Sequence, residues 1–423
     1  MNLRQSNKAK TDINTNLLVI RSTTELEYIN TLEEDYGMAQ YYDIFDNKEE
    51  LKQFTQQMLT SAVLLNKFVA PRLYNICSEI QDRLGFSEPI DFYVLSTPEQ
   101  NAFSLNGFGL VPHIVCLNSA LIQLASDDEL RFAIGHEIGH LVYNHNKLDF
   151  IRKFLFKEND ERPPAGLTIN YYHCLHYAEI SADRVGYLAM PDIRKVVNAI
   201  FKLHFGLPSE SVNFQIEEYL KQLDRIKELG VGEFFCTHPN PMLRIQALVD
   251  FESSELAPYK KAGCITASEL ETRLKALLQI MEEHPKTEKE ARIVEFLCAV
   301  GMFLIYDQES FDEKYEFLFD QVSIYTTQPE LYLNFKDQEE IHKRVKKVCK
   351  NYSNHKDDTL FELMRRCVVL VLVDGRLDIV EKERLHEVAK LLDMATDTLN
   401  FIIAQVSEAV LSPNNRTRVK KVL

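Results

Sequence analysis

The residues best suited to chemistry lie in the segment Asp127–His145, where His136, Glu137 and His140 form the pattern H-E-x-x-H. Helix positions four residues apart lie on one face, so the two imidazoles of this pattern project together. Two imidazoles supply half of a tetrahedral zinc site, and the glutamate beside the first can take a proton from a zinc-bound water. Because the pattern also arises by chance, the rest of the chain must supply a third ligand.

A third ligand is expected from the segment Ala178–Asp183, which reads AEISAD. Glu179 and Asp183 are four residues apart and share a helix face. We expect Glu179 to bind zinc and Asp183 to hydrogen-bond the far ring nitrogen of a ligand histidine, which fixes its tautomer. Without the upstream histidines, the same spacing would describe an exposed acidic stripe.

An alternative zinc site with three histidine ligands does not fit the register. That pattern needs a third histidine six residues after His140, and position 146 is asparagine. His145 is out of register by one residue. We interpret it as a polar residue at the end of the helix, where a cation suits the helix dipole.

With three protein ligands the fourth metal position is open for water, which is typical of a catalytic zinc site. Glu137 would take the proton of the water and deliver it to the leaving amine. His238, in the segment THP, is the candidate donor to the oxyanion. Arg244 is expected to anchor the structure by pairing with Asp183. The alternative for His238 and Arg244 is a capped helix start with a surface arginine.

Three further features concern the surroundings of the site. Gly139 lies mid-helix at a cost of about 1 kcal/mol relative to alanine, which indicates close approach of another backbone beside the metal. The strand that bears Asn101 and Ala102 is expected to present an open edge, on which an extended peptide lies as an added strand. The segment His173–His176 also holds two histidines and a cysteine, but their spacing matches none of the usual metal patterns.

Composition bounds the class of protein. A length of 423 residues predicts two or three domains. The formal net charge of −15 opposes binding to nucleic acid and to anionic membrane surfaces. Eight cysteines without a C-x-x-C pair favour reduced thiols in a cytoplasmic protein. We find neither a signal-peptide core nor an apolar run near the roughly 18 residues of a transmembrane helix, and we expect a soluble chain.

Hydrophobic periodicity predicts a mainly α-helical fold with a small antiparallel β-sheet. The first 47 residues are interpreted as an extension that packs loosely on the body. A helical stretch divided at Pro71 is expected over 47–84. Three short strands are expected over 89–95, 101–103 and 108–117, and a charged loop or flap over 147–168. Helices are also predicted over Tyr177–Met190 and Pro241–Phe251, and the chain beyond is almost uninterrupted helix.

The motifs NAF, DDELRFAIGHEIGHL, AEISADRVG and THPNPMLRI follow one another between Asn101 and Leu248. In this order they resemble the gluzincin-like zinc metallopeptidase family of the HtpX heat-shock protease and the CAAX prenyl endopeptidases. The resemblance implies an endopeptidase with one Zn²⁺ per chain that acts on proteins or peptides. It also implies that Asn101 contacts substrate and that His238 acts in the transition state. Many members are embedded in membranes, and this chain is closer to the soluble members.

The segment Glu290–Val406 resembles the TerB-like domain of tellurite-resistance and stress-response systems, on the residues DGRLD followed by Glu381. A metal site formed by Asp374, Asp378 and Glu381 is one interpretation of this run. The other is a helix that ends at Gly375 and a new helix that Asp378 and Glu381 cap. The predicted domains are an N-terminal extension (1–47), the metallopeptidase domain (48–255), a helical linker (256–289) and the TerB-like all-helical domain (290–423).

We therefore predict a soluble, zinc-dependent endopeptidase whose C-terminal helices form a regulatory or protein-interaction domain. A catalytically silent peptidase-like scaffold is an alternative of another class, although a decayed enzyme commonly loses its base and Glu137 is present. A zinc aminopeptidase is a second alternative. That class needs an acidic anchor for the substrate amine, and the corresponding stretch here is Asn101–Phe103.

Overall fold

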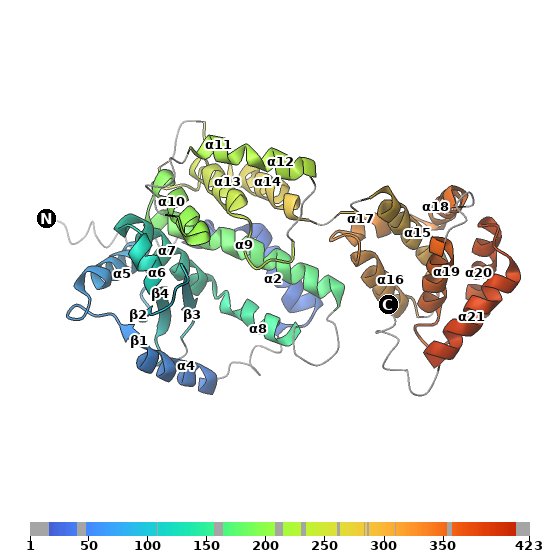
Figure 1. The fold of residues 1–423 in the computed structure, drawn as a ribbon, viewed down its shortest axis with the longest axis horizontal. Coiled ribbons are helices and arrows are strands. Elements are labelled where there is room, and N and C mark those ends of the chain that lie inside the picture. The colour runs from blue at the N-terminus through green and yellow to red at the C-terminus, as the bar shows by residue number, and fades with distance from the viewer. Residues whose placement is uncertain are drawn as a thin grey trace. The chain divides into compact units, whose positions relative to one another are not determined.

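The computed structural model of the chain divides into two compact units (Figure 1). The first comprises Met1–Pro163 and Leu167–Met281, and the second comprises Pro164–Gly166 and Glu282–Leu423. The four-part division of the chain given above stays a prediction. The structure describes residues 17–39, 48–107, 109–155, 164–207, 215–229, 234–259, 263–282, 284–285, 287–308, 310–352 and 358–411.

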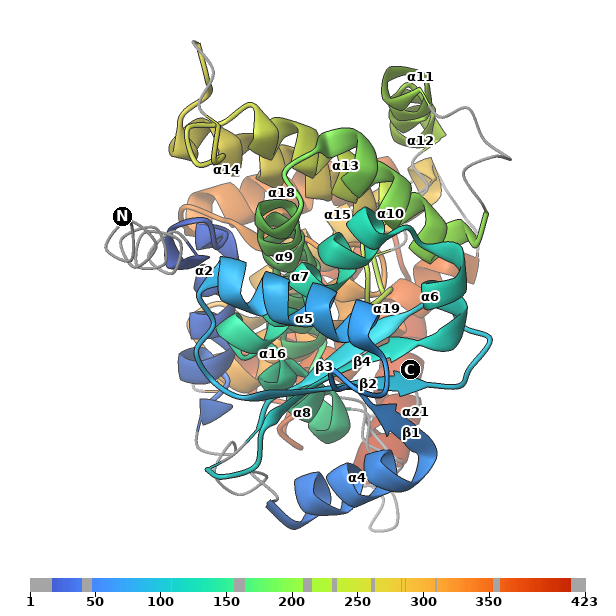
Figure 2. The same ribbon diagram turned by 90° about the vertical axis from the view of Figure 1, so that its left-hand side faces the viewer.

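The first unit combines a four-stranded sheet with helices (Figure 2). Its strands are β1 (Ala62–Leu64), β2 (Ile90–Leu95), β3 (Ala102–Leu105) and β4 (His113–Asn118). Its helices are α2 (Thr23–Asn30), the π-helix η1 (Thr31–Asp35), α4 (Lys48–Ser61), α5 (Pro71–Leu84), α6 (Ser119–Leu124), α7 (Asp127–Tyr143), α8 (Asn146–Leu155), α9 (Ala165–Ala189), α10 (Ile193–Phe205), α11 (Ile216–Leu220), α12 (Gln222–Leu229), α13 (Pro241–Glu252), α14 (Ala267–Leu278) and the short 3-10 helix η3 (Gln279–Met281).

The sheet is mixed, so the prediction of an antiparallel sheet was wrong. Its order is β1-β2-β4-β3, and β2 and β4 run parallel while both outer strands are antiparallel to their neighbours. The chain turns after β3 at Gly107, where a Cβ would lie 2.2 Å from the carbonyl oxygen of Val111. β3 lies on the outer side of β4 and does not separate β4 from β2, so these two strands pair directly. β1 was missed because three residues show no strand periodicity.

Alternation along the strands gives the sheet two apolar faces. Val115 and Leu117 belong to a core cluster with residues of α5 and α7. Tyr93 and Cys116 belong to a separate cluster with Met58 of α4. One face of the sheet therefore supports the helix that carries H-E-x-x-H, and α4 covers the other (Figure 2).

The N-terminal segment 17–39 is part of the core of the first unit, so the prediction of a loosely packed extension was wrong for these residues. Leu17 and Ile20 are buried. The backbone N–H of Ser22 donates to the Oγ of Ser181 in α9 at 3.0 Å. The rest of the predicted extension, residues 1–16 and 40–47, lies outside the described residues.

A helix, α8, begins where a charged loop or flap was predicted. Asn144 adopts a left-handed backbone conformation (φ 55°) that ends α7, and α8 starts two residues later. Leu148 and Ile151 are buried and give α8 its apolar face. Helix α9 begins at Ala165 and so covers the end of the predicted flap, while residues 156–163 lie outside the described part of the chain.

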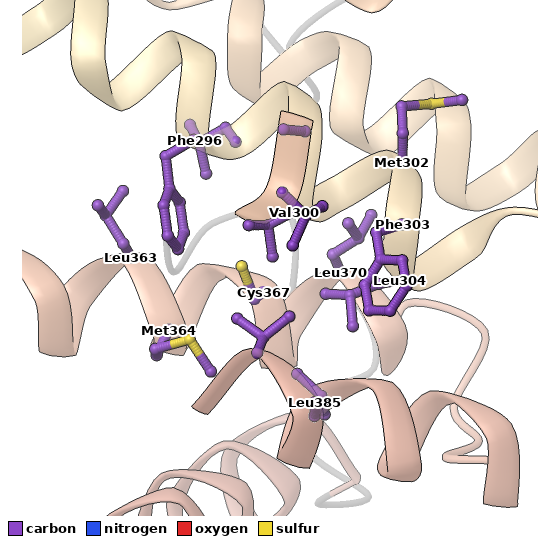
Figure 3. Close-up of a cluster of buried hydrophobic side chains, with 14 of the residues drawn as sticks. Phe296, Val300, Met302, Phe303, Leu304, Leu363, Met364, Cys367, Leu370 and Leu385 are labelled. Carbon is purple, nitrogen blue, oxygen red and sulfur yellow. The ribbon is translucent and has the colours of Figure 1, made fainter. Parts of the chain in front are cut away.

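The described residues of the second unit form helices joined by short turns, without a strand, as expected for this part of the chain. Figure 3 shows Phe296 and Val300 of α15, Cys367 of α19 and Leu385 of α20 in one buried cluster. The helices are α15 (Glu288–Ile305), α16 (Phe311–Ser323), α17 (Pro329–Leu333), α18 (Gln338–Tyr352), α19 (Asp358–Val371), α20 (Ile379–Leu391) and α21 (Thr396–Leu411).

Two findings concern membrane-spanning helices and the state of the cysteines. Among the helices described here, none has both the length and the apolar character that a bilayer span requires. All eight cysteines are free, and six of them are buried. The buried thiols act as small apolar side chains in the cores.

Candidate metal centre

Helix α7 begins with a complete capping box at Ser126. The hydroxyl of Ser126 accepts from the backbone N–H of Glu129, and the carboxylate of Glu129 accepts from the backbone N–H of Ser126 at 2.7 Å. A capped first turn satisfies two of the free N–H groups of the helix and defines where it starts. The helix then buries His136 and Glu137, and the ring of His136 lies beside Asp183 of α9.

Helices α7 and α9 approach each other closely at glycines. A Cβ on Gly139 would lie 2.9 Å from the Cα of Ala182 and 3.1 Å from the Cβ of Val185. On the opposite helix, a Cβ on Gly186 would lie 2.7 Å from the ring of Phe132. The backbone expected beside Gly139 is therefore that of α9, and this close approach brings the polar side chains of the two helices together.

His136, His140 and Glu179 form one cluster, in which one ligand atom from each lies within 4.8 Å of the others. The two Nε2 atoms are 3.0 Å apart. Glu179 Oε1 lies 3.4 Å from His140 Nε2, and Oε2 lies 3.7 Å from His136 Nε2. Ligand atoms about 2.0–2.2 Å from a tetrahedral zinc ion lie about 3.3–3.6 Å apart. Within the described residues this is the one cluster of such groups.

Asp183 lies behind the cluster and is fully buried. Its Oδ1 is 2.9 Å from the Nδ1 of His136. The guanidinium of Arg244 donates to both oxygens of Asp183, from Nη2 at 2.6 Å and from Nε at 2.8 Å. Such a two-point pair fixes the plane of the carboxylate. Asp183 can therefore accept the Nδ1–H of His136 and leave its Nε2 free toward the cluster.

The electrostatics of the cluster favour an anionic Glu179 beside an unprotonated His140. Burial opposes the charge of Glu179, but three surrounding histidines lower the pKa of its carboxyl to about 2. Burial holds the pKa of His140 well below its ordinary value. Burial lowers the pKa of His136, but Asp183 and Glu179 outweigh that effect and raise it above its ordinary value. Burial also raises the pKa of Glu137, an effect that His136 and Ser104 oppose. A carboxylate with a raised pKa is better matched to accept a proton near neutral pH.

His145 and Glu25 extend the cluster; the sequence interpretation placed His145 at the helix end without a part in the site, and it did not consider Glu25. The Nδ1 of His145 is 2.8 Å from the Nδ1 of His140, and its Nε2 is 2.9 Å from Oε1 of Glu25. His145 lies just past the C-cap of α7, at the helix end where it was predicted, and it is buried. Burial opposes the charge of Glu25, but His145 and Arg21 lower the pKa of its carboxyl to about 2. Local spacing carries no signal for Glu25, which lies far upstream.

His238 reaches the cluster from the segment before α13. Its Nε2 is 3.6 Å from Glu179 Oε1, and its side chain is 57% exposed. The Nε2 of His176, on α9, hydrogen-bonds the carbonyl oxygen of Cys236 at 2.9 Å and so ties down the same segment. Burial lowers the pKa of His176 to about 4. His173 stacks on the ring of Tyr28, and among the described residues His173, Cys174 and His176 form no metal-binding cluster.

Asn101 and Ala102 lie at the start of β3, the last strand in the sheet order. The amide oxygen of Asn101 accepts from the backbone N–H of Ala102 at 2.9 Å. Ala102 pairs with Leu117 of β4, which leaves the other side of β3 as an edge of the sheet. Helix α7 packs against β3, so this edge belongs to the same part of the unit as the cluster.

In the second unit, the ammonium of Lys314 lies between two of the acidic residues proposed as a metal site. Its Nζ is 2.5 Å from Glu381 and 3.0 Å from Asp374. Asp378 caps α20 in a capping box with Glu381. A buried lysine already balances these carboxylates, so we do not propose a metal ion there.

Comparisons with known proteins find similarity to metallopeptidases. Residues 69–157 match the model of peptidase family M48. The plastoglobule-localized metallopeptidase 48, chloroplastic, of Arabidopsis thaliana is 27% identical over 228 residues, which cover 49% of this chain and 66% of that protein. A protease HtpX homolog of Pyrobaculum islandicum is 37% identical over 78 residues, 18% of this chain and 22% of the relative. No solved structure matches significantly.

The chain thus carries a peptidase family M48 domain and is homologous to HtpX-like and plastoglobule M48 metallopeptidases. It spans at most 66% of the length of the relatives named above. This homology supports a metal-dependent, typically zinc-dependent, protease. The family match ends at residue 157, so the resemblance of the C-terminal part to TerB-like domains stays a prediction.

Proposed function

We propose that this chain is a zinc-dependent endopeptidase whose metal ion is held by His136, His140 and Glu179. The observation that carries the proposal is the convergence of their three ligand atoms. The donor chemistry fits zinc, because Glu179 Oε2 is buried without a hydrogen-bond partner beside two imidazole Nε2 atoms. When bound, zinc would lower the pKa of a water ligand and polarise a carbonyl oxygen.

The residues around the ligands would move and stabilise charge. Glu137, buried and with a raised pKa, would accept a proton from the attacking water on a carboxylate oxygen. It would then deliver that proton to the nitrogen of the leaving amine. His238 would donate from its imidazole to the carbonyl oxygen as negative charge develops there. Asp183, held by Arg244, would keep His136 in the binding tautomer.

The substrate would be an extended segment of a protein or peptide. The outer edge of β3 offers backbone groups to such a segment, apart from the Ser104 carbonyl, which accepts from Asn146 Nδ2 at 3.2 Å. Asn101 immediately precedes that strand. We also propose that the helical second unit regulates access or binds a protein partner, and that the protein acts in the cytoplasm. The eight free cysteines support that location.

The test is zinc content together with cleavage of a denatured protein. Glu137→Gln should keep zinc and lose cleavage by about 10²–10⁴-fold, whereas His136→Ala should lose both. Asp128→Asn, at the other end of α7, is the matched carboxylate-to-amide control and should cleave like the wild type. Cleavage retained in Glu137→Gln would refute the base, and zinc without any wild-type cleavage would favour the scaffold. Equal cleavage of N-terminally blocked peptides would exclude an aminopeptidase.

A further inference from the structure

A chain of hydrogen-bonding groups leads away from His140 to the N-terminal segment and has no part in the roles above. His140 Nδ1 faces His145 Nδ1 at 2.8 Å, and His145 Nε2 faces Glu25 Oε1 at 2.9 Å. Arg21 holds the same carboxylate oxygen, from Nε at 2.9 Å. Glu25 is fully buried and His145 nearly so. A buried chain of polar groups costs free energy unless each donor in it meets an acceptor.

The position of each proton in this chain of groups follows from the carboxylate of Glu25 at its end. A carboxylate only accepts, so His145 must donate from Nε2 to Glu25. A neutral His145 then offers a lone pair at Nδ1, and His140 donates its Nδ1–H to it. The remaining nitrogen of His140, Nε2, is left with a lone pair. Nε2 is the atom that faces His136 and Glu179.

We propose that Glu25 is a positioning residue of the metal centre, which acts through His145 to hold His140 in the tautomer and orientation that bind a divalent cation. The proposal rests on the zinc site proposed above. A hydrogen-bonded carboxylate makes a ligand imidazole more basic and fixes its ring, and here a second imidazole transmits the effect. Arg21 donates to the carboxylate, and the backbone N–H of Glu25 donates to the Oγ of Ser22, the N-cap of α2. The N-terminal segment thus contributes to the site as well as to the core.

The experiment measures zinc affinity of the full chain by competition with a chromophoric chelator. Glu25→Gln keeps the size of the side chain but allows an N–H to point at His145, which would reverse both tautomers. We expect it to weaken zinc binding by about 10- to 100-fold. Glu27→Gln is the matched control on the same helix, because Glu27 makes only an exposed pair with Lys275. It should leave the affinity unchanged.

A second variant separates the relay from a general effect on the fold. His145→Phe keeps a ring in place and removes both nitrogens, so it should also weaken zinc binding. Adding Glu25→Gln to His145→Phe should cost no further affinity, because the path to His140 is already broken. Additive losses, or an unchanged affinity in Glu25→Gln alone, would overturn the relay.

Two further measurements test whether a change in zinc affinity arises at the metal centre or from loss of the fold. The visible absorption bands of the cobalt-substituted protein report the ligand field, and we expect them to change in Glu25→Gln and not in Glu27→Gln. Unfolding of the zinc-free proteins is followed by circular dichroism. If one relay variant is unfolded the other decides, and failure of both to fold would overturn the proposal. A wild-type protein without zinc, or with zinc unaffected by His140→Ala, would instead refute the metal centre itself.

Discussion

Replacement of Gly139 by alanine should loosen the metal centre although alanine favours helix. The substitution gains about 1 kcal/mol in helix propensity. Its Cβ, however, would lie 2.9 Å from the Cα of Ala182, and carbon atoms rest at about 3.5–4.0 Å. The neighbour is backbone, so α7 and α9 must part by at least about 0.6 Å. Overpacking of this kind costs about 1–3 kcal/mol, which leaves a net loss of up to about 2 kcal/mol.

The displacement matters more to the site than to the fold. A metal constellation tolerates shifts of roughly 0.5 Å, and the ligands of α7 and α9 would be separated by more than that. We expect Gly139→Ala to bind zinc at least about tenfold more weakly in a chelator competition, with a lower unfolding midpoint. Gly301→Ala is the control, because its Cβ meets only the side chain of Leu318 in the second unit. Wild-type zinc affinity in Gly139→Ala would refute the reasoning.

Two further predictions concern the second unit. Burial, together with Glu330, raises the pKa of Glu282 to about 7. The folded state therefore holds this proton more tightly than the unfolded state, and stability should fall as pH rises from about 4.5 to about 7. Glu282→Gln should stabilise the unit by about 2–3 kcal/mol at pH 8 and by nothing near pH 4 in thermal unfolding; a pH-independent gain would contradict this. Lys314→Met should cost about 3–5 kcal/mol in urea unfolding, because it leaves Glu381 and Asp374 without their cation, and wild-type stability would contradict it.

The parts of the site that could be predicted from sequence are those governed by helix periodicity. His136 and His140, like Glu179 and Asp183, are four residues apart, so each pair lies on one face wherever its helix packs. A glycine in the middle of a helix lowers its stability, so Gly139 correctly indicated that another backbone, that of α9, lies close to α7 at this position.

What could not be predicted depends on contacts between distant parts of the chain. The parallel pairing of β2 and β4 is decided by β3 taking the outer position, and no local pattern encodes that order. Glu25 meets His145 across 120 residues. A glutamate in a short amphipathic helix reads as a solvated side chain until the tertiary contact is known.

The charges of the buried side chains at the site give an argument for a divalent cation that does not depend on the H-E-x-x-H motif. Arg244 donates to Asp183 at two points, and its Nη1 also lies 3.8 Å from Glu179 Oε2. Its single positive charge balances one of the three buried carboxylates, Asp183, Glu137 and Glu179, and leaves two negative charges beside the imidazoles of His136 and His140. Uncompensated burial costs several kcal/mol for each carboxylate. A divalent cation bound at Glu179 offsets the two negative charges, whereas a monovalent ion would leave one. The buried charges therefore favour a divalent cation independently of the H-E-x-x-H motif.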